Sequence, residues 1–155
     1  MYKNVLVPLD GSKLAECVLP HLEIVVTGCG VESVTFLRVV RPFIPMTDYM
    51  GDSVSAVDVA AINNDAVKAA EEYLKKITAD TKYTKVTARW EVIRGIEAES
   101  IADFAKTKGM DLIIIATHGR SGVSRWVWGS VADRVLRSAC VPVLMIRPPG
   151  CIPGF

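Results

Sequence analysis

The feature that most constrains the fold is the order in which short apolar runs alternate with segments of helical periodicity. Five short runs are rich in β-branched and other apolar residues, as buried strands are. The four stretches between them repeat apolar residues at helical spacing, with polar residues on the other side. Strict alternation of strand and helix is typical of a parallel, doubly wound sheet with right-handed crossovers. We therefore predict a single α/β domain.

The expected elements follow from these runs. Strands are predicted over 3–9, 34–40, 84–93, 112–116 and 141–147, and helices over 13–27, 58–79, 96–108 and 130–138. Ser12 is the expected N-cap of the first helix, and Gly28-Cys-Gly30 closes it. The run 84–93 alternates apolar and polar residues, which indicates a half-covered strand at the sheet edge. The long loop 41–57 is a candidate lid.

The composition of the chain excludes several classes of function. The chain has 155 residues, 50% of them hydrophobic, which suits one domain with a substantial core. Its 18 basic and 17 acidic residues leave a net charge of +1, so neither nucleic acid nor an anionic membrane is an expected partner. The apolar run before Asp10 is too short for a signal peptide, and no run approaches the roughly 20 residues of a membrane helix. We expect a cytoplasmic protein whose four cysteines are buried or incidental thiols.

A glycine-bearing loop follows the fourth predicted strand. It reads Ala116-Thr-His-Gly119 and then, after nine residues, Gly129-Ser130 at the start of a predicted helix. The first turn of a helix has backbone N–H groups without intrahelical partners, and glycine lets an anion approach them closely. Ser130 to Asp133 also has the spacing of a capping box. In a doubly wound sheet this loop and Asp10 both lie at the carboxyl ends of the strands, where ligands bind.

Three stretches read together resemble the universal stress protein family. They are Asn4-Val-Leu-Val-Pro-Leu-Asp-Gly-Ser12, Thr117-His-Gly-Arg-Ser-Gly122, and the run from Gly129-Ser-Val-Ala-Asp133 through Val141-Pro-Val-Leu-Met-Ile146. The resemblance covers residues 1–147 as one nucleotide-binding domain, with 148–155 as a flexible tail. It implies a Rossmann-like, open parallel five-stranded sheet of strand order 3-2-1-4-5 with helices on both faces.

The ATP-binding branch of that family carries the motif G-x-x-G-x9-G-[ST]. By position, the resemblance implies a nucleotide site made of Pro8, Asp10, Val39, Ile115, Ala116, Gly119, Gly129, Ser130 and Val131. Ala116 stands where the motif has its first glycine. Its methyl is expected to crowd the ligand, or to cost about 1 kcal/mol if the position requires a positive φ. The expected ligand is ATP, or ADP or AMP, with Mg²⁺ or Mn²⁺, and Asp10 is the candidate metal contact.

Several residues of the loop have both a functional and a structural interpretation. Secondary candidates for phosphate contact are His118, Arg120, Gly122 and Arg125. His118 is better interpreted as structural than as catalytic, since no second histidine lies nearby. Trp126 and Trp128 either pack the loop onto the body or cover a ligand. Asp10 itself could be an ordinary Asp-Gly turn residue.

These observations favour a nucleotide-dependent stress-response module with no catalytic residues and no or slow ATP hydrolysis. Two alternatives stay open: a weak ATP hydrolase that needs a partner, and an interaction module that binds no nucleotide. The last strand, Val143 to Ile146, is short, apolar and expected at a sheet edge, so we also predict a homodimer formed through it.

Overall fold

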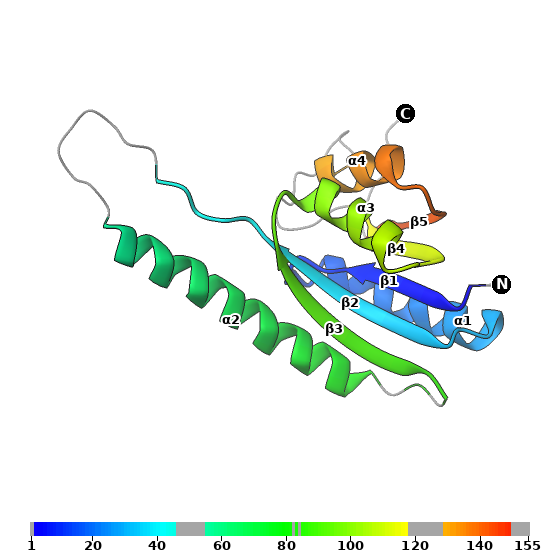
Figure 1. Ribbon diagram of the computed structural model, residues 1–155. Helices are drawn as coiled ribbons and strands as arrows, with labels where there is room; N and C mark the ends of the chain where they lie inside the picture. The colour runs from blue at the N-terminus through cyan, green and yellow to red at the C-terminus, as the bar shows by residue number, and fades with distance from the viewer. Residues whose placement is uncertain (1, 46–54, 82, 84, 118–128, 150–155) are drawn as a thin grey trace.

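The computed structural model of the protein describes residues 2–45, 55–81, 83, 85–117 and 129–149 (Figure 1). The strands are β1 (Asn4–Pro8), β2 (Ser33–Val40), β3 (Thr87–Arg94), β4 (Leu112–Ala116) and β5 (Val143–Ile146). The helices are a 3₁₀ turn, η1 (Ala15–Val18), and α1 (Leu19–Cys29), α2 (Ala56–Asp80), α3 (Glu97–Thr107) and α4 (Ser130–Ser138). The predicted alternation of strand and helix is confirmed.

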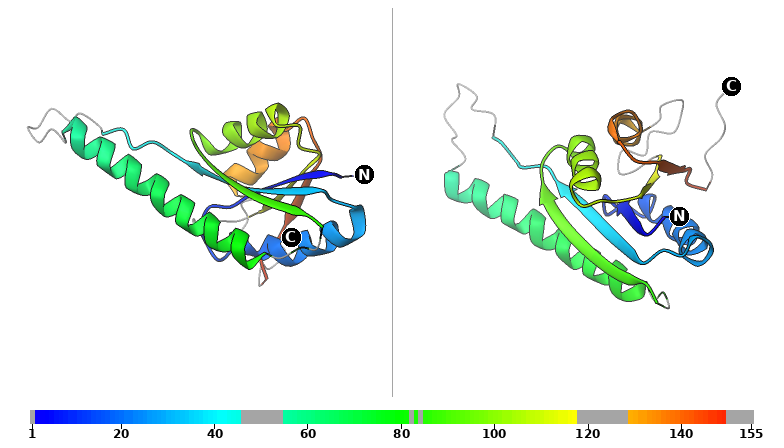
Figure 2. Two further views of the ribbon diagram at one scale, coloured as in Figure 1. Left: turned by 60° about the horizontal axis from the view of Figure 1, so that its bottom comes forward. Right: turned by 45° about the vertical axis from the view of Figure 1, so that its right-hand side comes forward.

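All four strand pairings in the sheet are parallel, and the strand order is β3-β2-β1-β4-β5. This is the order that the sequence predicts. In Figures 1 and 2 the helices α1 and α2 cover one face of the sheet, and α3 and α4 cover the other. The chain leaves β1 toward β2 and β3, then returns to the other side of β1 as β4. The junction of β1 and β4 is therefore the switch point of the fold.

Alternate residues of the strands supply two separate cores. Val5 and Val7 point to the face of α1 and α2, where they pack with Leu22 and Leu74. Leu6, between them, packs on the other face with residues of α3 and α4. All three β1 side chains are fully buried, because both faces of a parallel sheet are covered.

The first helix differs from the prediction. The segment after Ser12 is a turn followed by η1, and the regular α-helix begins only at Leu19. Pro20 explains the difference, because it has no amide hydrogen to donate to the carbonyl of Glu16 four residues earlier. That carbonyl accepts instead from the amide of Leu19, which closes a 3₁₀ turn. The end is as predicted: Gly30 caps α1 with a left-handed φ of 68°.

The second helix begins earlier than predicted. Ser55 is its N-cap and accepts a hydrogen bond from the amide of Asp58. The first half of α2 extends past the end of the sheet (Figure 1), and its residues Val57 and Ile62 are exposed. Most of the expected lid, 46–54, and the end of the expected tail, 150–155, lie outside the described residues.

Two further sequence predictions can be compared with the structure. The third strand begins at Thr87 rather than 84, and it lies at the sheet edge with a half-buried pattern, as expected. Within the described ranges, Cys29 and Cys140 are free thiols. No helix in the described part of the chain is long and apolar enough to span a membrane.

Replacing a central core side chain should unfold the protein far more readily than replacing an exposed one. Phe36→Ala removes a fully buried ring from β2, so we expect a loss of about 3–5 kcal/mol in the free energy of unfolding. Ile24→Ala on α1 is the control, because that side chain is 68% exposed and its loss should cost less than about 0.5 kcal/mol. Urea titrations measure both, and equal losses would contradict the assigned core.

Candidate functional site

A cavity of about 530 Å³ opens at the carboxyl ends of β1, β2 and β4. Eight of the nine residues predicted for the nucleotide site line it: Pro8, Asp10, Val39, Ile115, Ala116, Gly129, Ser130 and Val131. The ninth, Gly119, lies outside the described residues, as do His118, Arg120, Gly122, Arg125, Trp126 and Trp128. The topology thus brings together residues that are more than a hundred positions apart in the sequence.

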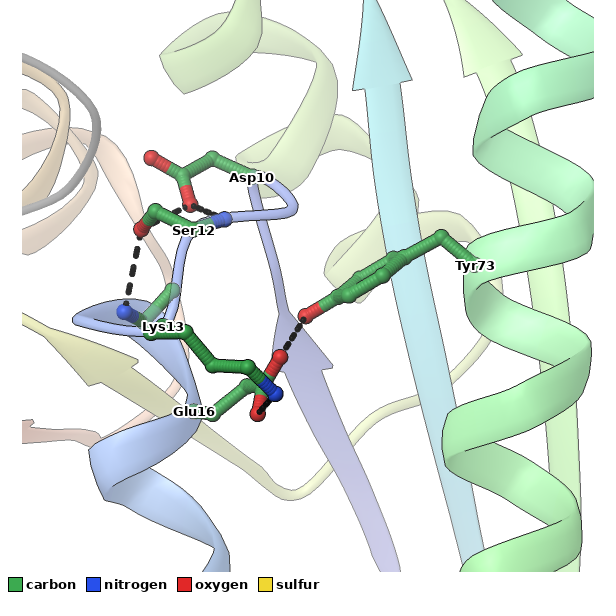
Figure 3. A network of polar contacts seen from close by, with 6 residues as sticks. Asp10, Ser12, Lys13, Glu16 and Tyr73 are labelled. Atoms are coloured by element: carbon green, nitrogen blue, oxygen red, sulfur yellow. Dashed lines mark hydrogen bonds and ion pairs between the residues drawn. The ribbon is translucent and has the colours of Figure 1, made fainter.

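Asp10 lies two residues after the end of β1, and its carboxylate is held by its own loop. Its Oδ1 atom accepts hydrogen bonds from the amide of Ser12 at 2.9 Å and from the Ser12 hydroxyl at 2.6 Å (Figure 3). The Ser12 hydroxyl in turn accepts the amide of Ala15 at 3.1 Å, so Ser12 makes a capping contact at the start of η1. A carboxylate can accept about four hydrogen bonds, so these two fix its orientation without exhausting it. The turn contacts of Asp10 are therefore compatible with a functional role.

The two described ends of the glycine-bearing loop are joined by the backbone. The amide of Gly129 donates to the carbonyl of Thr117 at 2.8 Å, and the amide of Thr117 donates to Ile146 of β5 at 2.8 Å. Thr117 is also buried. These bonds place the N-terminus of α4 directly beside the end of β4.

The capping box predicted at Ser130 is not formed. Gly129, which has no side chain, is the N-cap of α4, and Ser130 is its first helical residue. The carbonyl of Gly129 accepts the amide of Asp133 at 3.0 Å, which is the first intrahelical bond. The first-turn amides of residues 130–132 are therefore the ones that helix geometry leaves available to an anion.

Ala116 does not carry the backbone strain considered above. It is the last residue of β4, pairs with Ile146, and is buried in the core shared with α1 and α2. Lys85 is the only non-glycine residue with a positive φ in the described part of the chain. An alanine therefore adopts the backbone of this position without penalty, and only its methyl group affects the cavity.

The cavity also contains charged residues that the sequence analysis missed. Arg38 and Arg41, at the carboxyl end of β2, line it together with Glu97 at the start of α3. Arg41 and Glu97 form an ion pair at 2.5 Å. A sequence signal for Arg38 did exist, since it is the one charged residue inside the predicted strand 34–40 and stands next to Val39.

Helix α2 supplies a further wall that no sequence signal indicated. Ala66 and Ala69 line the cavity, and both are small and exposed. One turn further along the helix, the Tyr73 ring lies under the Arg38 guanidinium, 5.6 Å from the ring centroid to Cζ. The Tyr73 hydroxyl donates to Glu16 at 3.4 Å, and Glu16 is paired with Lys13 at 2.8 Å (Figure 3). Burial, followed by the charge and hydrogen bond of Glu16, raises the pKa of Tyr73.

A sequence model of the universal stress protein family matches residues 1–147, and the chain belongs to that family. Universal stress protein MJ0531 of Methanocaldococcus jannaschii is 29% identical over 150 residues, covering 96% of this chain and 84% of the relative. The structure of UspA from Lactobacillus plantarum has a TM-score of 0.77 at 23% identity, over 94% of this chain and 98% of that one. These likenesses agree with the observed fold.

Some structures of similar fold were determined with nucleotides. A family protein from Arabidopsis thaliana with AMP bound has a TM-score of 0.63 at 15% identity, over 96% of this chain and 93% of its own. The protein from Archaeoglobus fulgidus in complex with dAMP has a TM-score of 0.55 at 20% identity, over 94% and 98%. A complex with cAMP has a TM-score of 0.59 at 17% identity, over 94% and 97%.

The raised pKa of Tyr73 predicts a loss of stability at alkaline pH. A tyrosine whose pKa is raised on folding contributes stability that is complete below its ordinary pKa of about 10 and falls as the pH rises above it. Tyr73→Phe removes the ionisable group, so the stability difference between wild type and variant should shrink above about pH 10. Denaturant titrations across that range measure the difference. If the free energies of unfolding of the two proteins change in parallel up to about pH 11, the assigned environment of Tyr73 is contradicted.

Proposed function

We propose that the protein is a nucleotide-binding stress-response module whose ligand is ATP, or ADP or AMP, bound in the cavity at the β1/β4 switch point. The observation that carries the proposal is that Asp10, Val39 and the start of α4 line one cavity. A carboxylate at the end of β1 suits the ribose hydroxyls of a nucleoside. The first-turn amides of α4 suit its phosphates. The nucleotide-bound relatives described above support the same class of ligand.

The ligand would lie across the switch point. Its nucleoside would meet Asp10 and the backbone at Val39, and its phosphates would meet Gly129, Ser130 and Val131. Ala116, between these two groups, leaves the cavity open, since the volume at the strand ends is about 530 Å³. An open cavity favours nucleotide binding over the alternative of an interaction module with a closed site.

A divalent cation would reach the site with the phosphates. No cluster of three or more His, Cys, Asp or Glu side chains able to hold a metal occurs in the ranges that the structure describes. Mg²⁺ or Mn²⁺ would therefore take most of its ligands from phosphate oxygens and water, with Asp10 as the protein contact, as is usual for Mg²⁺ on nucleotides.

Hydrolysis is proposed to be absent or slow. The acidic residues that line the described part of the cavity are Asp10 and Glu97. Asp10 is oriented by Ser12, and Glu97 is paired with Arg41. A general base must be placed to take a proton from the attacking water. Asp10 is instead proposed to bind the ribose, and Glu97 is held by its ion pair with Arg41. We propose a cytoplasmic location, which the free thiols of Cys29 and Cys140 support.

Calorimetric titration tests the ligand. With Mg²⁺ present, we expect wild type to bind ATP more tightly than AMP, because added phosphates meet more of the α4 amides. Asp10→Ala should weaken both nucleotides at least about ten-fold, since it removes charged hydrogen-bond acceptors from the ribose. Gly129→Val places a side chain at the α4 N-terminus and should weaken ATP more than AMP.

The matched control is Asp103→Ala, which removes an exposed carboxylate of α3 that does not line the cavity. It should bind as wild type does. No detectable binding of ATP by the wild type at millimolar concentration would overturn the proposed function. Phosphate release that persists unchanged in Asp10→Ala and Gly129→Val would show contamination rather than hydrolysis by this site.

We also propose a homodimer through β5. This strand is an edge of the sheet, and Leu144 on it is 37% exposed. The carbonyls of Pro142 and Ile146 accept from Ile113 and Thr117 on the β4 side. With a period of two, the backbone groups of Val143 and Met145 point away from the sheet, where a second copy can pair with them.

Proline substitutions test this edge. Met145→Pro removes an outward amide, so it should give a folded monomer, because proline is tolerated at an edge whose N–H faces away from the sheet. Leu144→Pro removes an amide directed toward β4 and should lower the free energy of unfolding instead. Light scattering gives the mass and circular dichroism gives the folded fraction. A monomeric wild type at micromolar concentration would end the proposal.

A further inference from the structure

We propose that Arg38 is a positioning residue: its guanidinium, held between the backbone of Gly11 and the ring of Tyr73, fixes the loop that presents Asp10 to the ligand. The inference rests on the proposed function, because it assigns that loop the nucleoside end of the nucleotide. It adds a contact between Arg38 of β2 and Tyr73 of α2 that supports the loop after β1.

The first observation is the close approach of the guanidinium to Gly11. Gly11 has a φ of +82°, in the left-handed region that favours glycine. A Cβ at this position would lie 1.9 Å from the Nη1 atom of Arg38 and 3.0 Å from its Cζ atom. The guanidinium therefore occupies the space that any other residue at 11 would need. Gly11 stands between Asp10 and Ser12, the two residues whose hydrogen bonds set the carboxylate.

The second observation is the contact that the guanidinium makes on its opposite side. Its Cζ atom lies 5.6 Å from the centroid of the Tyr73 ring, within the range of a cation–π contact. Tyr73 is anchored in turn by its hydroxyl, which donates to Glu16 on η1 (Figure 3). The Arg38 side chain is partly buried, and its Nε atom is fully buried. The guanidinium is thus stacked between α2 and the loop.

A direct role and a positioning role for Arg38 make different predictions for Tyr73. Arg38 lines the cavity, so it could touch a ligand, whereas Tyr73 is not among the lining residues. If Arg38 acts only on the ligand, loss of the Tyr73 ring should leave affinity unchanged. If Arg38 positions the loop, removing the ring should weaken binding almost as removing the guanidinium does.

The experiment measures nucleotide affinity by calorimetry in Arg38→Met, Tyr73→Leu, Tyr73→Phe and the double variant Arg38→Met/Tyr73→Leu. We expect Arg38→Met and Tyr73→Leu each to weaken binding about two- to ten-fold, equally for AMP and ATP, because the loop serves the nucleoside end. Tyr73→Phe keeps the ring, so this variant should retain an affinity close to that of the wild type. The double variant should lose no more than the larger single loss, because both changes remove one contact.

A second measurement needs no nucleotide. Amide NMR signals of Gly11 and Ser12 in the ligand-free protein should shift, with faster hydrogen exchange, in Arg38→Met and Tyr73→Leu and stay in place in Tyr73→Phe. Ile77→Ala is the control for a merely destabilised helix, since Ile77 is buried one turn further along α2. It should leave the Gly11 signal and the nucleotide affinity of the folded protein unchanged.

The outcomes separate the two proposals. Unchanged Gly11 and Ser12 signals in Tyr73→Leu overturn the role of Arg38 even if nucleotide binds. Wild-type affinity in Tyr73→Leu overturns it as well. If the variants shift these signals but the wild type binds no nucleotide, the proposed function and the ligand part of this inference are overturned. The contact that fixes the loop then still stands.

Discussion

The central strand β1 is paired with β2 on one side and with β4 on the other, and its side chains are buried on both faces. Because the chain reaches β2 and β4 by crossovers in opposite directions, the helices that follow β1 and β4 cover opposite faces of the sheet. Their first residues diverge at the carboxyl ends of the strands, and a cavity lies between them. The cavity is a consequence of this topology, and the residues after each strand determine its chemistry.

Charge is distributed unevenly around that cavity. Arg41 and Glu97 neutralise each other where β2 meets α3. The carboxylate of Asp10, the guanidinium of Arg38 and the ring of Tyr73 form a second group that connects β1, β2 and α2. Tyr73 and the half of α2 that continues past the end of the sheet belong to one continuous helix (Figure 1).

The sequence predicted the fold well because each layer has its own periodicity. The apolar run 112–116 and the helical spacing of 130–138 carry strong local signals, and both elements lie where they were expected. The predicted start of the first helix was wrong. The apolar spacing fits an α-helix from residue 13, but Pro20 lacks the amide hydrogen that an α-helix needs there, so α1 begins at Leu19. The capping box at Ser130 was wrong for a similar reason, since Gly129, not Ser130, occupies the cap.

By itself, the sequence determined the class of fold, the family, and the residues that meet at the ends of β1 and β4. These depend on short motifs and on periodicity, which are local properties of the chain. Only the tertiary structure decided that Arg38 lies between Gly11 and Tyr73, that Arg41 pairs with Glu97, and that alanines of α2 form a wall of the cavity. Those contacts join residues from separate elements, and their geometry depends on how α2 and α3 pack across the sheet, which no local pattern encodes.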